Sequence, residues 1–278
     1  MHFGAIILDL FIYFCNMSIV KAKKSLGQHF LKDQNIARKI TDSLLPVTGN
    51  VLEIGPGMGV LTRHLFANRQ FSVQAIDIDR ESIDYLHAEL PDFQDRIIYG
   101  DFLKMDLTAF YTTPFSVIGN LPYNISSQIF FRIIEHRQLI PQVVCMIQKE
   151  VAERVSAPYG NKTYGILSVF LQAFYNIEYL FTVSEKVFDP PPKVKSAVIR
   201  LLRNSRENLD CEEKLFFQIV KTGFNQRRKT LRNSLRSVCP EGFESDYLNL
   251  RPEQLSVDDF IRLCQQIGCA QQNTSSIR

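Results

Sequence analysis

Apolar positions in the first two thirds of the chain follow two alternating periods. Short, mostly apolar runs, typical of buried strands, lie at 51–54, 72–77, 96–101, 115–119 and 143–148. Between and around these runs, apolar residues recur at helical spacing, as in Ile36, Ile40 and Leu44 after the capping residue Asp33. Strands that alternate with helices predict an α/β fold with a parallel sheet covered by helices on both faces.

The pattern changes after the buried helix expected at 162–174. Residues 177–183 and 195–203 are two β-rich runs with no helix-length segment between them, so the last strand is expected to be antiparallel. From Leu209 onward only helical patterns occur, and Ser256 is a plausible N-cap for the last of them. The sequence therefore predicts a mostly parallel sheet domain at 17–206 and a small all-helical domain at 207–278.

Residues 1–16, MHFGAIILDLFIYFCN, stand apart from this pattern. The apolar stretch is too short for a transmembrane helix, Asp9 interrupts it, and it lacks the positive start and cleavage site of a signal peptide. We expect translation to begin at Met17, which would make residues 1–16 a start-site artefact or a disordered leader. A targeting or anchoring leader is the alternative.

Charge is distributed unevenly although the net charge is only +3. A first basic cluster consists of Lys21, Lys23 and Lys24. A second basic stretch without any Asp or Glu consists of Lys214, Lys221, Arg227, Arg228, Lys229, Arg232 and Arg236. Such local stretches fit a polyanionic partner, or else a solvated helix surface.

The 6 cysteines form no CxxC pair and have no nearby histidine. They therefore predict free thiols in a reducing cytosol, a cytoplasmic protein and no metal site.

A glycine-rich turn joins the first strand to its helix. Gly55, Gly57 and Gly59 allow a ligand to approach the backbone, and the helix N-terminus adds partial positive charge. Asp77 closes the next strand, where an acidic side chain can accept hydrogen bonds from ribose hydroxyls. Together these residues predict a cofactor that contains adenosine.

Three further residues narrow the choice of cofactor. Pro56 removes one backbone donor that a pyrophosphate would use, and Glu53 suits a cationic ligand. Asp101, at the end of the third strand, can accept a hydrogen bond from an adenine amino group, or can simply cap a turn. The set favours S-adenosylmethionine, and at this point the chain resembles a class I S-adenosylmethionine-dependent methyltransferase with a Rossmann-like sheet.

The tetrad Asn120-Leu121-Pro122-Tyr123 follows the fourth strand. It resembles the signature of methyltransferases that act on exocyclic amines of nucleobases. The Asn120 side-chain oxygen and the Leu121 carbonyl can accept hydrogen bonds from an adenine amine. Pro122 fixes the backbone, and Tyr123 offers a face on which an unstacked base can lie.

Longer blocks narrow the resemblance. The chain is similar to the small-subunit ribosomal RNA adenine dimethyltransferases, the kasugamycin-resistance family, from about residue 21 to residue 268. The blocks are GQHFLKDQNI (27–36), GNLPYNIS (119–126), VFDPPPKVKSAV (187–198), FNQRRKTLRNSL (224–235) and RPEQLSVDDF (251–260). The resemblance implies dimethylation of two adjacent adenosines near the 3′ end of small-subunit rRNA, within a pre-ribosomal particle. It implies no obligate protein partner, which predicts a monomer.

The resemblance also assigns roles to individual residues. The implied cofactor contacts are His29, Leu31, Gly55, Asp77, Asp101 and Asn120, to which the residue chemistry adds Glu53 and Gly57. His29 stands where many relatives have Asn, and Asp77 where Glu is more common. Phe188 matches an aromatic residue that faces the target base opposite Tyr123, with a core phenylalanine as the alternative.

The expected RNA contacts come from the two basic regions. They are Lys23, Lys24, Arg227, Arg228, Lys229, Arg232 and Arg236. On one continuous helix, Arg228, Arg232 and Arg236 would form a stripe able to follow RNA phosphates. The alternatives left open are a resistance methyltransferase of large-subunit rRNA, a DNA adenine methyltransferase, and an assembly factor for which methylation is secondary.

Overall fold

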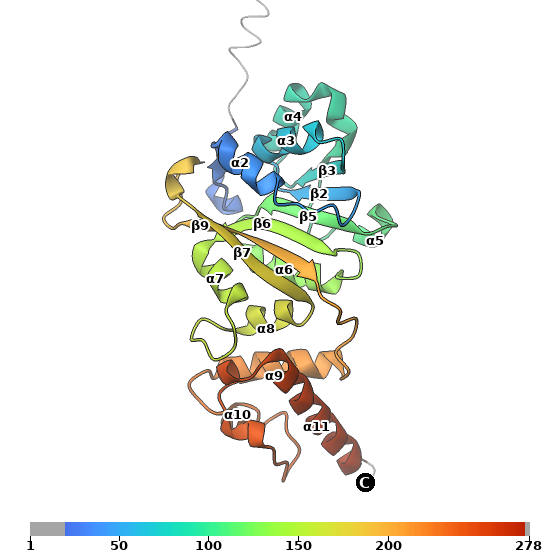
Figure 1. Cartoon of the computed structure of the whole chain (residues 1–278), viewed down its shortest axis with the longest axis vertical. Helices are drawn as coiled ribbons and strands as arrows, with labels where there is room; N and C mark the ends of the chain where they lie inside the picture. Colours follow the sequence, from blue (N-terminus) through green and yellow to red (C-terminus); the bar gives the residue numbers. More distant parts are fainter. Residues whose placement is uncertain (1–19, 276–278) are drawn as a thin grey trace, which may run out of the picture.

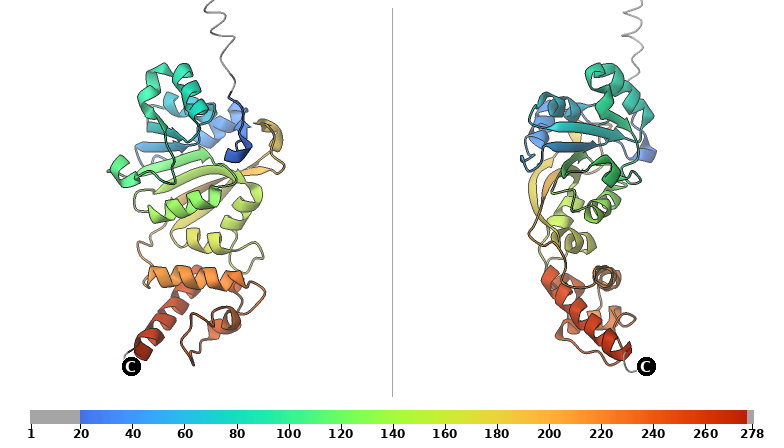
Figure 2. Two further views of the ribbon diagram at one scale, coloured as in Figure 1. Left: turned by 180° about the vertical axis from the view of Figure 1, so that it is seen from behind. Right: turned by 90° about the vertical axis from the view of Figure 1, so that its right-hand side faces the viewer.

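The computed structural model of this chain describes residues 20–275 (Figure 1). The expected start at Met17 and the segment 1–16 lie outside the described residues. Within them, the molecule is elongated, with the sheet at one end and the last helices at the other (Figure 2).

The central sheet has 7 strands in the order β4-β3-β2-β5-β6-β9-β7. The strands are β2 (Asn50–Ile54), β3 (Ser72–Asp77), β4 (Ile97–Tyr99), β5 (Phe115–Asn120), β6 (Gln142–Gln148), β7 (Tyr175–Val183) and β9 (Ser196–Arg203). The first five in spatial order are parallel, and β9 is antiparallel to both of its neighbours. The predicted mostly parallel sheet with an antiparallel last strand is confirmed.

Helices cover both faces of this sheet because its central strands are apolar on both sides. The helices of this region are α2 (Gln34–Thr41), α3 (Val60–Ala67), α4 (Arg80–Glu89), α5 (Leu107–Phe110), α6 (Ser126–Glu135), α7 (Lys149–Ser156) and α8 (Ile166–Gln172). Val117 packs in a core with α6, α7 and α8, whereas its neighbour Ile118 packs in a second core with α2 and α3. This continuous burial is what the apolar runs in the sequence predicted.

A short second sheet was not predicted. Strand β1 (Phe30–Leu31) pairs with β8 (Phe188–Asp189) in antiparallel register. It ties the chain just after the 3₁₀ turn η1 (Lys24–Leu26) to the connection between β7 and β9, which also contains η3 (Glu185–Val187). Residues far apart in the sequence thereby meet beside the sheet.

After β9 the described chain is helical. Its helices are α9 (Glu213–Asn225), α10 (Leu231–Ser234) and α11 (Val257–Ser275), with the 3₁₀ turns η4 (Asp246–Asn249) and η5 (Pro252–Gln254). Phe170 of α8 meets Phe217 of α9 edge to face, with ring centroids 4.6 Å apart. These helices therefore share one apolar core with the sheet domain.

Details of this helical region differ from the expectations. The Ser256 hydroxyl accepts from the Asp259 N–H at 3.1 Å, so its capping role is confirmed. Helix α11 continues to Ser275. The three residues Arg228, Arg232 and Arg236 do not lie on one continuous helix. Helix α10 spans only Leu231–Ser234, and Arg228 lies in the turn after α9.

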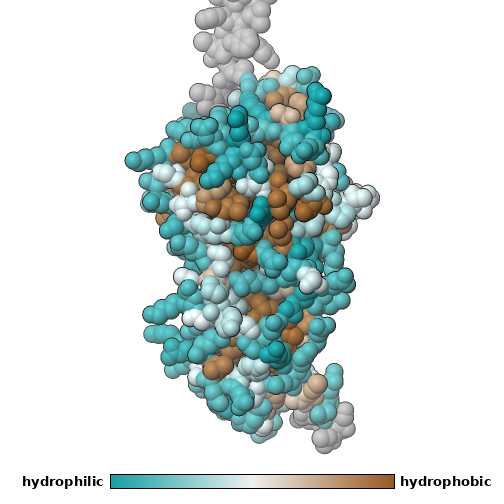
Figure 3. Space-filling model, in the orientation of Figure 1, coloured by the Kyte–Doolittle hydropathy of each residue, from teal (hydrophilic) through white to brown (hydrophobic). Residues whose placement is uncertain are grey.

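The surface is mixed in character. On the face shown in Figure 3, hydrophilic residues predominate and apolar residues form separate patches. Among residues 20–275, no helix combines the length and apolar character needed to cross a membrane. The same part of the chain holds no group of three or more His, Cys, Asp or Glu side chains placed to bind a metal ion.

Close backbone packing at the end of β5 gives a test of the fold. A Cβ on Gly119 would lie 2.4 Å from the carbonyl oxygen of Ile54 in the adjacent strand. We expect Gly119→Ala to lower the free energy of unfolding by about 1–3 kcal/mol, because β2 and β5 must separate to admit the methyl group. Denaturant unfolding measures the change. Gly49→Ala is the control, since a Cβ there meets no described atom within 4 Å.

Candidate active site

A cavity of about 260 Å³ lies at the carboxyl ends of β2, β3 and β5. Strand β2 sits between β3 and β5, so the chain leaves it in opposite directions and a crevice opens at this point. Of the residues proposed from the sequence, those that line the cavity are His29, Leu31, Glu53, Gly55, Gly57, Asp77, Asp101, Asn120, Pro122 and Tyr123. The fold thus brings every expected cofactor residue together.

The glycine turn packs tightly against the N-terminal segment. Gly57 has a φ of +54°, and a Cβ on it would lie 2.9 Å from the ring of Phe30. Its N–H donates to Asp77 Oδ2 at 3.2 Å. A side chain at this position would separate the turn from the wall of the cavity opposite it.

Asp77 is held by backbone donors on both oxygens. Its Oδ1 accepts from the Asp79 N–H at 2.9 Å, and its Oδ2 accepts from Gly57. Burial raises the pKa of this carboxyl above its ordinary value. Each oxygen keeps a further lone pair, so the carboxyl group can accept two hydroxyl groups side by side.

Glu53 is a buried carboxyl group at the base of the cavity. It is 2% exposed, and its Oε2 has no hydrogen-bond partner among the described residues. Burial raises its pKa to about 8. A buried carboxyl without a partner is costly to ionise unless a cation comes close, so the site is suited to a positively charged ligand.

The Asn120 side chain is fixed by a backbone contact. Its Nδ2 donates to the carbonyl oxygen of His29 at 2.9 Å. This hydrogen bond orients the amide so that Oδ1 remains as the acceptor. An acceptor held in one orientation is the arrangement that an incoming amine requires.

Tyr123 is positioned by a residue that the sequence did not single out. Its hydroxyl lies 2.5 Å from Ser196 Oγ, which is buried at the start of β9. The Tyr123 ring lies beside the His29 ring, with centroids 5.4 Å apart. Burial raises the pKa of the Tyr123 hydroxyl, so the group stays neutral at ordinary pH. Ser196 lies in the VFDPPPKVKSAV block, which was the available signal.

Asp101 lies just beyond β4 and lines another part of the cavity. Its Oδ1 accepts from the Leu103 N–H at 2.9 Å, and Lys104 Nζ is 3.5 Å from its Oδ2. Asp101 therefore caps a turn, which was the alternative role expected for it, and it also lines the cavity.

Two of the residues expected to take part in catalysis do not line the cavity. Leu121 is 1% exposed with its side chain in the core, and its N–H donates to the carbonyl of Met146 at 3.0 Å. Phe188 is also 1% exposed and packs in the core with Leu31 and Val183. Phe188 therefore has the core position given as its alternative, beside the β1–β8 pairing, and its contact with a target base stays a prediction.

The basic residues have different surroundings. Lys23 pairs with Asp79 and Glu81, and Arg232 pairs with Glu244 through hydrogen bonds of 2.8 and 2.7 Å. The guanidinium of Arg227 donates to the carbonyl of Lys162. Lys24, Arg227, Arg228, Lys229, Arg232 and Arg236 are exposed.

Comparison with known proteins gives one family. The family model described as ribosomal RNA adenine dimethylase matches residues 19–266. A protein of Cytophaga hutchinsonii named ribosomal RNA small subunit methyltransferase A is 57% identical over 91% of this chain and 99% of its own length. A protein of the same name from Porphyromonas gingivalis is 56% identical over 89% of this chain and 98% of its own.

Two solved structures support the same conclusion. A dimethyladenosine transferase from Plasmodium falciparum has a TM-score of 0.75 at 26% identity, covering 87% of this chain and 98% of its own. The 23S rRNA methyltransferase ErmE has a TM-score of 0.62 at 27% identity, covering 86% and 99%. The match to the family model and the identity to these relatives show that this chain belongs to the ribosomal RNA adenine dimethylase family.

Proposed function

We propose that this enzyme transfers methyl groups from S-adenosylmethionine to N6 of two adjacent adenosines near the 3′ end of small-subunit rRNA, during assembly of that subunit. The product is N6,N6-dimethyladenosine. One observation carries the proposal: the Asn120 amide is oriented by His29 as an acceptor, beside Tyr123 and at the edge of a cavity fit for a cationic adenosine derivative.

The residues around the cavity fit S-adenosylmethionine. Both Asp77 and Asp101 line the cavity. In this proposal Asp77 accepts hydrogen bonds from the ribose hydroxyls, and Asp101 accepts one from the adenine amino group. Glu53 has an unpartnered buried oxygen suited to the cationic end of the molecule. The turn at Gly55 and Gly57 leaves the backbone open to close approach.

The chain's own residues make the amine reactive. S-adenosylmethionine supplies a methyl group on a positively charged sulfur. Asn120 Oδ1 and the Leu121 carbonyl accept the two N–H groups of the adenine amine, which directs the nitrogen lone pair toward that methyl group. Tyr123 stacks on the base and is itself held by Ser196. The amine loses one proton to water after each transfer, so no strong base is needed.

The names of similar proteins support small-subunit rRNA as the substrate. Relatives called ribosomal RNA small subunit methyltransferase A are 53–57% identical to this chain, whereas the 23S rRNA methyltransferase ErmE is 27% identical. A large-subunit substrate is the second candidate, because ErmE shares the fold at a TM-score of 0.62.

The RNA is proposed to bind along exposed cations at both ends of the molecule. These are Lys24 near the cavity, and Arg227, Arg228, Lys229, Arg232 and Arg236 around α10. In this proposal residues 17–206 perform the chemistry, and residues 207–278 hold the rRNA of the pre-ribosomal particle. The enzyme acts as a monomer in the cytoplasm, where that particle is assembled.

A methyl-transfer assay with small-subunit particles, large-subunit particles and DNA tests the proposed function. We expect transfer to small-subunit particles alone, and a loss of about 10²-fold or more in Asn120→Ala because the oriented acceptor is gone. The transfer rate of Tyr123→Ala should fall as far. Tyr123→Phe keeps the stacking ring, so its transfer rate should fall less. Circular dichroism and melting temperature confirm that each variant is folded. Near-normal turnover by Asn120→Ala would refute the site, and preferred transfer to large-subunit particles would favour the second candidate.

Charge removal around α10 tests the RNA surface. Arg228→Ala should weaken binding to small-subunit particles and reduce the slope of log affinity against log salt by about one, since each phosphate contact releases about one counterion. Arg232→Ala is the matched comparison and should reduce the slope by less, because Glu244 already pairs with that guanidinium. An unchanged slope in Arg228→Ala would contradict the proposed RNA surface. Filter binding at several salt concentrations gives both quantities.

The raised pKa of Glu53 predicts how cofactor binding depends on pH. Below pH about 8 the buried carboxyl is neutral, so binding a cation at pH 7 must release a proton and affinity must rise with pH up to about 8. Calorimetry of S-adenosylmethionine binding in buffers of different ionisation enthalpy measures this proton release. The Glu53→Gln variant should release less. The same release in both proteins would show that Glu53 does not face the cation.

A further inference from the structure

Residues 23–31, here called the N-terminal strap, form one wall of the cavity. Every residue from Ser25 to Leu31 lines it, yet none of them belongs to the seven-stranded sheet. The strap crosses the carboxyl ends of the strands that carry Glu53 and Asp77. Its position therefore decides whether the cavity is closed on that side.

One end of the strap is tied to the connection between β7 and β9. Phe30 and Leu31 pair with β8, and the Lys32 N–H donates to the carbonyl of Val187 at 2.8 Å. His29 Nδ1 lies 2.8 Å from the carbonyl of Pro190. With the bond from Asn120 to His29, these contacts fix the half of the strap nearest the proposed catalytic residues.

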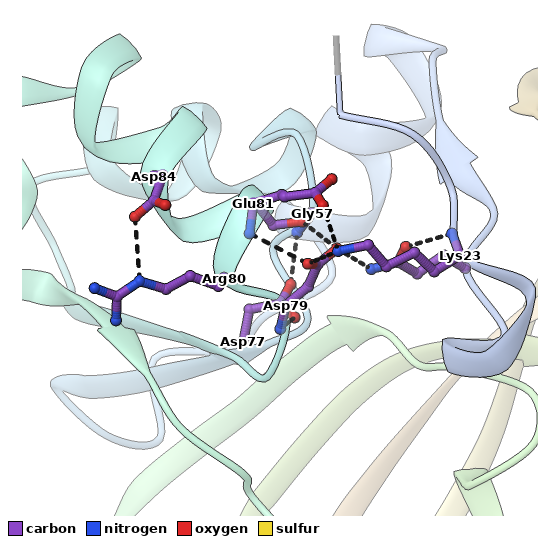
Figure 4. A network of polar contacts seen from close by, with 9 residues as sticks. Lys23, Gly57, Asp77, Asp79, Arg80, Glu81 and Asp84 are labelled. Carbon is purple, nitrogen blue, oxygen red and sulfur yellow. Dashed lines mark hydrogen bonds and ion pairs between the residues drawn. The ribbon is translucent and has the colours of Figure 1, made fainter. Parts of the chain in front are cut away.

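The other end is tied to Asp79 at the start of α4 (Figure 4). Lys23 Nζ lies 2.5 Å from Asp79 Oδ1 and 3.1 Å from Glu81 Oε1. Gln28 Nε2 donates to Asp79 Oδ2 at 2.9 Å, and Gln28 Oε1 accepts from the Lys23 N–H at 2.8 Å. Both ends of a six-residue turn of the strap are thus bound to a single carboxylate.

This carboxylate is adjacent to the proposed ribose acceptor. The Asp79 N–H donates to Asp77 Oδ1 at 2.9 Å. The Asp79 side chain is 1% exposed. Burial alone would raise its pKa, but the hydrogen bonds from Gln28 and Lys23 hold the pKa below its ordinary value. A buried, ionised carboxylate needs these partners. Removing one of them leaves a charge that is neither hydrated nor fully hydrogen-bonded, which is costly in free energy.

The middle of the strap has little freedom of its own. Gly27 has a φ of +63°, and a Cβ on it would lie 2.6 Å from Asn124 Oδ1. Asn124 Nδ2 is 3.4 Å from the carbonyl of Ser25, which is a long contact. The turn between Lys23 and Gln28 is therefore held over the cavity mainly from Asp79.

We propose that Lys23, Gln28 and Asp79 form a latch that keeps the N-terminal strap closed over bound S-adenosylmethionine. The inference rests on the proposed function for the identity of the ligand. It makes Lys23 a positioning residue for cofactor binding and not the phosphate contact that its place in a basic cluster predicted. The latch acts on the rate at which the cofactor leaves, while Asn120 and Tyr123 keep their own anchors.

Binding measurements on Lys23→Met test the latch without relying on catalysis. We expect the dissociation constant of S-adenosylhomocysteine, measured by calorimetry, to rise about tenfold or more, as for loss of a hydrogen bond to a charged group. The increase should lie in the dissociation rate measured by stopped flow. Hydrogen exchange of the amides at 25–28 should become faster, whereas that at 30–31, held by β8, should not change. Lys23→Arg should restore most of the affinity.

Controls separate this role from others. Lys21→Met removes an exposed charge two residues away and should leave the dissociation constant unchanged. Gln28→Leu removes the second contact to Asp79 and should resemble Lys23→Met, while α4 keeps its capping residue in both variants. In turnover, the change should appear in the KM for S-adenosylmethionine and not in kcat or in the affinity for small-subunit particles.

Two results would overturn the latch. One is an unchanged dissociation constant in both Lys23→Met and Gln28→Leu. The other is weaker particle binding in Lys23→Met with normal cofactor binding, which would return Lys23 to the RNA surface. Either can occur while the wild-type protein methylates rRNA, so failure of the latch is distinguishable from failure of the proposed function.

Discussion

The site depends on one buried carboxyl group, that of Asp77, held between two backbone N–H groups. Gly57 donates to one oxygen and thereby fixes the glycine turn, and Asp79 donates to the other and fixes the start of α4. Through the Asp79 side chain the same arrangement extends to Lys23 and Gln28 (Figure 4). Three segments from different parts of the sequence are thus aligned by two neighbouring carboxyl groups, because a carboxyl group away from water must be satisfied by fixed donors.

Local signals in the sequence were sufficient for the sheet and for most of the cavity. Short, mostly apolar runs that alternate with helical patterns predict buried parallel strands, and residues that follow such strands meet at one edge. The sequence alone therefore predicted that Gly55, Asp77 and Asn120 lie close together. It also predicted Ser256 as the capping residue of α11.

The features that were missed depend on contacts between distant parts of the chain. The β1–β8 pairing involves two residues on each side, too few to produce a period, and it places Phe188 in the core. The expected arginine stripe failed because the chain turns after α9 and α10 is only four residues long. Lys23 carries the same charge as Lys24, and the positions of Asp79 and Glu81 distinguish their surroundings.

The orientation of the Asn120 amide has a consequence for which bases the site admits. One N–H of the Asn120 amide is bound to the His29 carbonyl, which fixes the orientation of the group and leaves Oδ1 as its acceptor. Guanine and uracil carry a keto oxygen at the corresponding edge, and two oxygen lone pairs placed face to face repel each other. If Asn120 binds the target base as proposed, selection against these bases depends on one backbone contact of the N-terminal strap and precedes methyl transfer.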